Sequence, residues 1–241
     1  MSDFLPQKKT GERLELLDFW RSLSLFLMII WHGCYDAVLL QLADASLLSG
    51  FFPELVKNLC GASFVLISGL CVTISRDSTR RGFFVFLAGL LVSVATALIG
   101  YPVAFGILQL LGVCMLLYRP LARLFRAFPP AAGAALCLCA FFLSGALLRD
   151  AETALPFLYP LGLHTADFFS ADYYPLLPWA FLFYAAAAAA PRLLPRLPRP
   201  HLPAALTAPG RCSLWIYLLH QPILLAVLYL VSRLDICAHS L

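Results

Sequence analysis

His32 and Asp36 are the residues whose types and spacing best fit catalytic chemistry. They lie four positions apart near the end of an otherwise apolar stretch, FLMIIWHGCYD, which begins at Phe26. On a helix, such positions share one face and lie one turn apart. A carboxylate in this position can orient the imidazole and raise its basicity, which is what a general base needs. The pair therefore predicts proton transfer, with a purely structural contact as the alternative.

The composition indicates that the helix carrying this pair lies in lipid. Of the 241 residues, 61% are hydrophobic and 12% are charged, and the mean hydropathy is +0.85. A soluble domain is about half apolar and about a quarter charged. The chain is therefore expected to be an integral membrane protein, and its net charge of +4 gives no reason to expect a nucleic-acid partner. The cysteines have no metal-type spacing, so we expect no metal.

Seven stretches are long and apolar enough, or nearly so, to cross a bilayer, which takes about 20 apolar residues. The sequence therefore predicts an all-α, polytopic fold. The spans are expected at about 19–42, 53–75, 82–100, 104–120, 131–149, 173–190 and 211–232.

The basic residues predict the orientation of these spans. Of the 17 Lys and Arg, all but Lys57, Arg149 and Arg233 lie in the N-terminal segment or in the loops after spans two, four and six. By the positive-inside rule, the N-terminus is cytoplasmic and the C-terminus is outside. We expect a multi-pass protein of the inner or plasma membrane, in three parts: a cytoplasmic segment 1–17, a single transmembrane domain 18–233 and an exterior tail 234–241.

Several polar residues fall in the middle or outer part of the predicted spans. Gln109, Asp172 and His220 join His32 and Asp36 at this depth. Polar side chains in a membrane usually face the bundle interior and mark a candidate site. For Gln109 and His220, a hydrogen bond that only fastens two helices is an equally good interpretation. The loop 150–172 is acidic, and its apolar LPFLYPLGLH segment is expected to enter the membrane interface.

A second polar group falls at the predicted inner face. It comprises residues that open spans one, three and seven, namely Asp18, Arg21, Arg80, Arg81 and Arg211. Arginines at cytoplasmic helix ends follow from topology alone. The alternative is a site for a phosphate-rich donor such as coenzyme A, because guanidinium groups bind phosphate bidentately.

These segments resemble a known family. LLDFWRSLSLFLMIIWH is similar to the first helix of polytopic membrane acyltransferases, whose pattern is Asp-x-x-Arg-Gly, an apolar run and then His. ADYYPLLPW and SLWIYLLHQP are the most specific segments. Together they resemble a compact bacterial family similar to the catalytic domain of heparan-α-glucosaminide N-acetyltransferase, over roughly residues 13–232.

The resemblance implies a membrane acyltransferase. Its donor would be cytoplasmic acetyl-CoA, and its acceptor an amine or hydroxyl, often sugar-linked, at the outer side. The resemblance implies roles for Asp18, Arg21, His32, Asp36, Asp172, Tyr173, His220 and Gln221. With the polar positions above, the predicted sets are catalytic His32, Asp36 and His220; substrate-binding Gln109, Asp172, Tyr173 and Gln221; and donor-binding Asp18, Arg21, Arg81 and Arg211.

Two positions depart from the family pattern. Ser22 replaces the glycine after Arg21, and Gln109 replaces a histidine, so this side chain cannot act as a base. Two other functions stay open. A transporter of a small polar solute would also need intramembrane His, Asp and Gln, and a non-catalytic accessory protein, alone or in an oligomer, would tolerate Gln109.

Overall fold

The protein is built from helices that cross a membrane. The computed structural model describes residues 14–239, and for residues 125, 126 and 233–239 only the backbone is considered. Among these residues there is no β-strand, and seven helices are long and apolar enough to span a bilayer. This confirms the predicted all-α, seven-span fold. Lys8, Lys9 and Arg13, which carry part of the predicted inner charge, lie outside the described residues.

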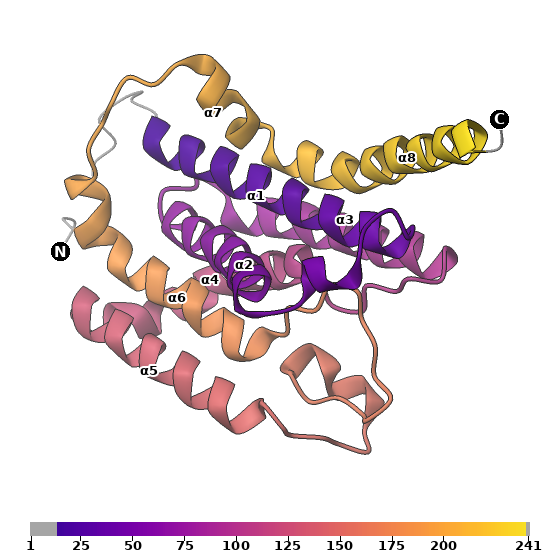
Figure 1. The fold of residues 1–241 in the computed structure, drawn as a ribbon. Coiled ribbons are helices and arrows are strands. Elements are labelled where there is room, and N and C mark those ends of the chain that lie inside the picture. The colour runs from indigo at the N-terminus through magenta and orange to yellow at the C-terminus, as the bar shows by residue number, and fades with distance from the viewer. Residues whose placement is uncertain (1–13, 240–241) are drawn as a thin grey trace. The chain divides into compact units, whose positions relative to one another are not determined.

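The helices follow the predicted spans closely, with short elements between them (Figure 1). In chain order the elements are α1 (Glu15–Leu39), η1 (Ala45–Leu48), α2 (Phe51–Val72), α3 (Ser78–Leu98), α4 (Ile107–Arg126), α5 (Pro130–Leu148), η2 (Pro156–Leu161), α6 (Leu176–Leu193), η3 (Leu194–Arg196), α7 (Ala204–Arg211) and α8 (Ser213–His239).

The described chain divides into two compact units. One is Val65–Leu197, and the other comprises residues 14–64 and 198–239. The first unit contains α3 to α6 with the end of α2. The second contains α1, the beginning of α2, α7 and α8. The single domain predicted over 18–233 stays a prediction.

In the first unit, small residues let two helix pairs pack closely. A Cβ added at Gly82 of α3 would lie 2.8 Å from the Cβ of Met115 and 2.9 Å from the carbonyl oxygen of Gly112, both in α4. The alanine run of α6 is largely buried, and α6 packs along α5. Backbones approach this closely only where side chains are small.

The loop between α5 and α6 of the same unit is held by short backbone contacts. Isolated bridges join Phe105 to Tyr173 and Glu152 to His164, and η2 forms within the apolar segment predicted to enter the interface.

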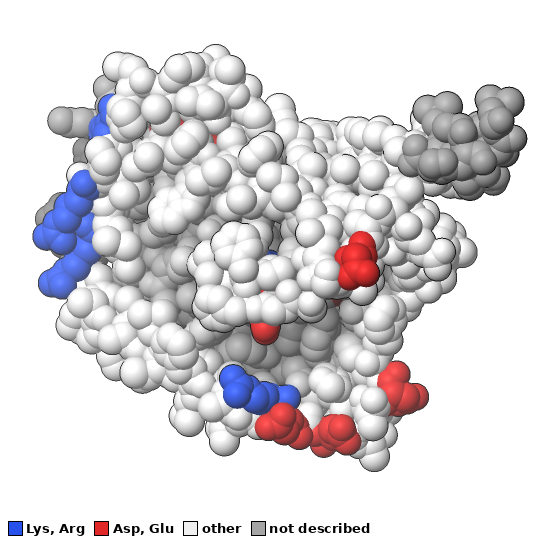
Figure 2. Space-filling model, in the orientation of Figure 1, with Lys and Arg blue, Asp and Glu red and all other residues white. Residues whose placement is uncertain are grey.

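Figure 2 shows a group of acidic side chains beside the loop between α5 and α6, at the lower right, and a group of basic ones on the left, where α6 ends.

In the second unit, α1 packs along both α7 and α8. α8 runs beside α1 and has two features that matter for the site: His220 is buried and Pro222 lies inside the helix. These contacts bring residues about 190 positions apart in the sequence next to each other.

Two element boundaries differ from the predictions. α4 continues through Pro120 to Arg126, although the fourth span was expected to end at residue 120. Proline removes one backbone donor, and transmembrane helices tolerate this loss. The predicted spans leave the segment after α6 as a loop, yet it contains η3 and leads into α7, with Pro203 at the N-cap of α7. Proline fits the start of a helix because the first N–H groups have no partner within the helix.

Candidate functional site

A histidine pair lies between α1 and α8. The ring centroids of His32 and His220 are 5.0 Å apart, with an interplanar angle of 58°. The Nδ1 atom of His220 lies 2.6 Å from the backbone oxygen of Tyr217. A carbonyl oxygen only accepts hydrogen bonds, so Nδ1 must carry the proton there. The neutral His220 ring therefore has its lone pair at Nε2, and its orientation is fixed by its own helix.

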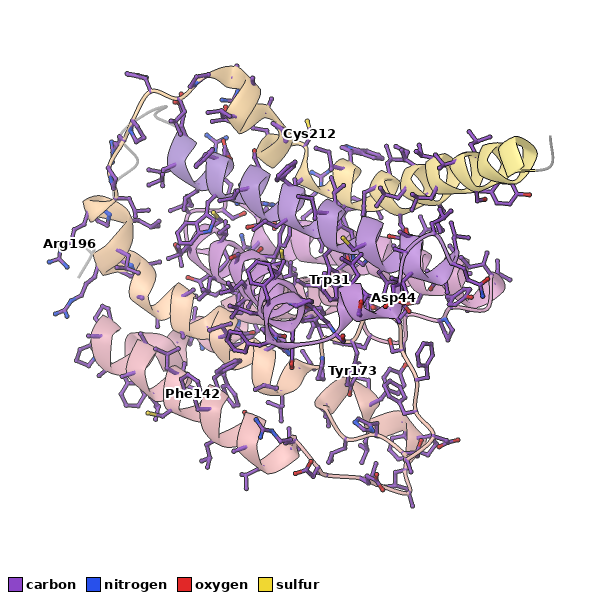
Figure 3. All side chains as sticks on the ribbon, in the orientation of Figure 1. Trp31, Asp44, Phe142, Tyr173, Arg196 and Cys212 are labelled. Atoms are coloured by element: carbon purple, nitrogen blue, oxygen red, sulfur yellow. The ribbon has the colours of Figure 1, made fainter. Side chains whose placement is uncertain are left out.

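His32 differs from His220 in its surroundings. His220 is buried, whereas His32 is partly exposed. Its neighbour along α1 is Trp31, labelled in Figure 3. Within the described residues the ring of His32 contacts His220 and makes no hydrogen bond to Asp36. No hydrogen bond within the described residues occupies its nitrogen atoms.

Asp36 and Gln221 join the same two helices one turn further along α1. The amide nitrogen of Gln221 lies 2.8 and 2.9 Å from the two carboxylate oxygens of Asp36. Asp36 is only 1% exposed. A carboxylate accepts from N–H groups, so this contact decides which way the Gln221 amide points. The amide oxygen of Gln221 is then directed away, and it has no hydrogen-bond partner in residues 14–239.

Lys57 is a neighbour of this site that the sequence did not single out. It lies at an exposed position in α2, near enough to His32 for the two side chains to interact electrostatically. The sequence contained one signal of this position: Lys57 is one of the few basic residues outside the loops predicted to face the cytoplasm.

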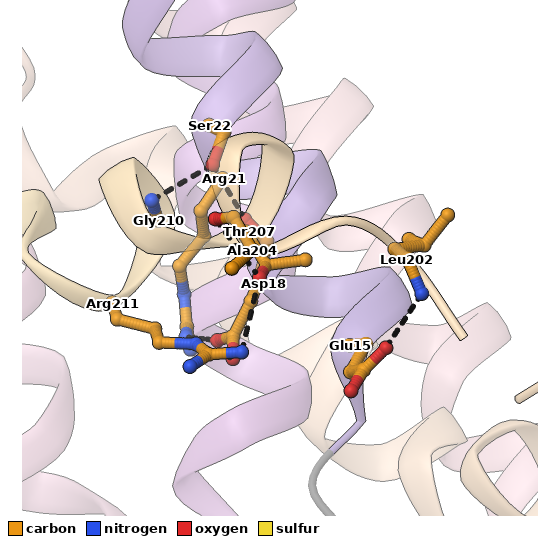
Figure 4. A network of polar contacts seen from close by, with 9 residues as sticks. All are labelled: Glu15, Asp18, Arg21, Ser22, Leu202, Ala204, Thr207, Gly210 and Arg211. Carbon is orange, nitrogen blue, oxygen red and sulfur yellow. Dashed lines mark hydrogen bonds and ion pairs between the residues drawn. The ribbon is translucent and has the colours of Figure 1, made fainter. Parts of the chain in front are cut away.

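A polar network ties the beginning of α1 to α7 (Figure 4). Asp18 is 6% exposed and pairs with two arginines: Nη1 of Arg21 lies 3.1 Å from Oδ1, and Nε of Arg211 lies 3.6 Å from Oδ2. Nη2 of Arg211 also donates to Thr207 at 3.0 Å. Two guanidinium groups therefore converge on one carboxylate, and these three side chains together carry one net positive charge.

Ser22 has a defined structural role in this network. Its hydroxyl donates to the backbone oxygen of Asp18 at 3.1 Å and accepts from the backbone N–H of Gly210 at 2.8 Å. A Cβ at Gly210 would overlap the backbone oxygen of Asp18. Ser22, which replaces the glycine of the family pattern, therefore has a structural function. Its hydroxyl holds the end of α7 against α1, and Gly210 permits the close approach of the two helices.

The other predicted site residues lie in the first unit. Gln109 is 3% exposed, and both ends of its amide are engaged. Its nitrogen donates to Ser93 Oγ at 2.8 Å, and its oxygen accepts from the N–H of Gly106 at 2.6 Å. Asp172 lies beside Gly106, because a Cβ there would be 3.1 Å from Asp172 Oδ2. Gln109 thus holds α3 to α4 and closes the turn that faces Asp172.

Tyr173 lies in an aromatic group next to this turn, and Figure 3 labels it just before α6. Its hydroxyl donates to the backbone oxygen of Tyr159 at 2.6 Å. Burial, assisted by Tyr159, raises the pKa of Tyr173 to about 12. The phenol therefore stays protonated near neutrality, as a donor and not a base. The rings of Phe168 and His164 pack around it.

The structure thus brings the predicted residues together in separate sets. His32, Asp36, His220 and Gln221 form one, and Asp18, Arg21 and Arg211 form another, both in the second unit. Gln109, Asp172 and Tyr173 form a third, in the first unit. Arg81, predicted with the donor-binding residues, belongs to the first unit, where Nη1 of its guanidinium is 3.5 Å from Ser75 Oγ.

Comparison with known proteins adds one finding. No curated protein and no solved structure matches the chain significantly. A family model does match: it is described as heparan-alpha-glucosaminide N-acetyltransferase, catalytic, and it covers residues 13–222. This range includes the histidine pair, the Asp36–Gln221 contact and the Asp18 network. The chain therefore belongs to the family of the heparan-alpha-glucosaminide N-acetyltransferase catalytic domain, a family of membrane acetyltransferases.

Proposed function

We propose that this protein transfers an acetyl group from acetyl-CoA to an amine or hydroxyl acceptor, and a sugar-linked acceptor is the form to test first. The donor is bound at the cytoplasmic face, and the acceptor reacts nearer the outer face of the inner or plasma membrane. The observation that carries the proposal is the histidine pair between α1 and α8, 5.0 Å between ring centroids, in a chain of an acetyltransferase family.

His32 is the general base in this proposal. It removes a proton from the attacking nitrogen or oxygen as that atom bonds to the thioester carbon of acetyl-CoA. The carbon–sulfur bond then breaks, and coenzyme A leaves as a thiolate that takes up a proton. His32 suits this role because it is partly exposed and no hydrogen bond within the described residues occupies its nitrogen atoms.

His220 and Asp36 position the base. The bond from Nδ1 to Tyr217 fixes the ring of His220, and this ring packs against His32. The Asp36–Gln221 contact fastens α1 to α8 one turn further on. Placing a base within a fraction of an ångström matters, since a misplacement of about 1 Å can cost about 10²-fold in rate.

The Asp18 network supplies the donor site. Phosphate groups of acetyl-CoA bind to Arg21 and Arg211, because guanidinium groups match phosphate oxygens bidentately. Asp18 lies between the two arginines and holds them in place. Together, Asp18, Arg21 and Arg211 carry one net positive charge, which attracts the anion.

The first test is direct. The full chain, purified and reconstituted in liposomes, is given acetyl-CoA labelled in the acetyl group, together with glucosamine or glucose as a matched amine and hydroxyl acceptor. We expect labelled product that depends on the protein. Flux of the sugar without acetyl-CoA, and without label transfer, would instead favour a transporter.

Arg21→Ala is expected to weaken donor binding. Losing one charge-assisted contact to phosphate costs about 1.5–3 kcal/mol, so the Kd for coenzyme A should rise about 10- to 150-fold. Titration of the purified protein by calorimetry measures this. The matched control is Arg196→Ala, an exposed arginine after α6, which should leave the Kd unchanged. Equal affinities of Arg21→Ala and the unmodified protein would contradict the assignment.

A further inference from the structure

The outward face of α3 consists of an arginine followed by a continuous apolar stripe. Arg80 begins the stripe, which continues at spacings of four and three residues. Its members share one helix face and expose 43–83% of their surface: Phe84, Leu87, Leu91, Val94 and Leu98. The stripe faces away from α4, because the buried Gly82 and Gly89 form the opposite face of α3, against α4.

The length of the stripe is close to the thickness of the hydrocarbon core of a bilayer. From Arg80 to Leu98 the helix rises about 27 Å at 1.5 Å per residue, close to the roughly 30 Å of a hydrocarbon core. Arg80 therefore lies at one membrane boundary, with apolar side chains beneath it across the bilayer. Its guanidinium carbon is 5.8 Å from the ring centroid of Phe84, so the charge is held directly above the apolar surface.

Positive charge accumulates around this end of α3. Arg76, Arg80 and Arg81 lie within six positions, and Arg119 of α4 reaches the same place, where its Nη2 donates to the backbone oxygen of Arg76 at 2.9 Å. The helix N-terminus adds partial positive charge.

Asp77 offsets this charge only in part. Its carboxylate caps α3 by accepting from the N–H of Arg80 at 3.0 Å, and it lies 3.8 Å from Arg119. This end of α3 thus has one carboxylate, that of Asp77, and four guanidinium groups, those of Arg76, Arg80, Arg81 and Arg119. The described residues of this end therefore leave a net positive charge at the membrane boundary, which an anion would offset.

We propose that this end of α3 binds the phosphate of an anionic phospholipid, whose acyl chain lies along the stripe. Arg80 contacts the phosphate, while Arg76 and Arg81 supply neighbouring charge. A soluble phosphate would satisfy the arginines alone, but a phospholipid matches both the charge and the apolar stripe beneath it. None of these arginines belongs to the donor network, which consists of Asp18, Arg21 and Arg211.

Native mass spectrometry of the full chain in detergent, titrated with phosphatidylglycerol or with phosphatidylcholine of the same acyl chains, tests the proposal. We expect tighter binding of phosphatidylglycerol. Arg80→Ala should weaken it about five-fold, the effect of one basic residue near an anionic headgroup. Arg196→Ala, an exposed arginine of the same unit, should have no effect. Equal losses from both variants would indicate diffuse attraction and would overturn the site.

Phe84→Ala separates a lipid from a soluble phosphate. It keeps every charge but removes the ring beneath Arg80, so phosphatidylglycerol binding should also weaken. Glycerol 3-phosphate should not compete at concentrations where the lipid saturates. If it competes equally, or if Phe84→Ala binds lipid normally, the occupant is a soluble anion and the proposal is wrong. Melting curves of Arg80→Ala and Phe84→Ala without added lipid verify that these variants fold.

Discussion

His32→Gln is expected to lower the turnover of acetyl transfer by about 10²–10⁴-fold, the usual contribution of a general base. Glutamine is similar in size and can hydrogen-bond, but it cannot take up a proton. The variant should still insert in the membrane and bind coenzyme A with unchanged Kd, because the Asp18 network lies near the other end of α1. Steady-state transfer of labelled acetyl groups measures the loss.

Three variants control this result. His201→Gln changes an exposed histidine before α7 and should keep full turnover. His220→Gln should lose less than His32→Gln, because His220 positions the base, and the double variant should be no worse than His32→Gln alone, as expected for groups that act as a unit. If His32→Gln keeps normal transfer while His220→Gln loses it, His220 is the base and His32 is a packing residue.

The helices themselves could be predicted from hydropathy and loop charge, because a membrane forces apolar stretches of fixed length. The exceptions have local causes. Pro120 looked like the end of a helix, but α4 continues through it. α7 is only eight residues long, and its contact with α1 depends on Gly210 and Ser22, which no periodic pattern marks.

The sequence predicts individual residues of the candidate site, but it does not predict their contacts. Helical spacing put His32 and Asp36 on one face, yet the hydrogen-bond partner of Asp36 is Gln221, 185 positions away. Which helices pack together is a property of the whole bundle and leaves no signal in local spacing. Gln109 illustrates the same limit: the sequence marks it as polar and buried, whereas its engagement by Ser93 and Gly106 depends on the close packing of α3 on α4.

The Asp36–Gln221 contact predicts a large effect on stability. Gln221→Leu leaves the buried carboxylate without its hydrogen-bond donor, and Asp36→Leu leaves the Gln221 amide without its acceptor. A buried polar group that loses its partner costs about 1–3 kcal/mol, which for a chain of this size lowers Tm by about 2–12 °C. Asn58→Leu, at an exposed position in α2, is the matched control and should leave Tm nearly unchanged.

The double variant Asp36→Leu with Gln221→Leu separates stability from positioning. Replacing both partners by apolar groups removes the unsatisfied atoms, so Tm should recover most of the loss. Turnover should stay about 10²-fold low, because two leucines pack without fixing the register of α1 against α8 on which His32 depends. A double variant as unstable as the single ones would show that the contact is not the source of the loss. Full recovery of turnover would show that Asp36 does not position the base, since packing between the helices would then be sufficient to place His32.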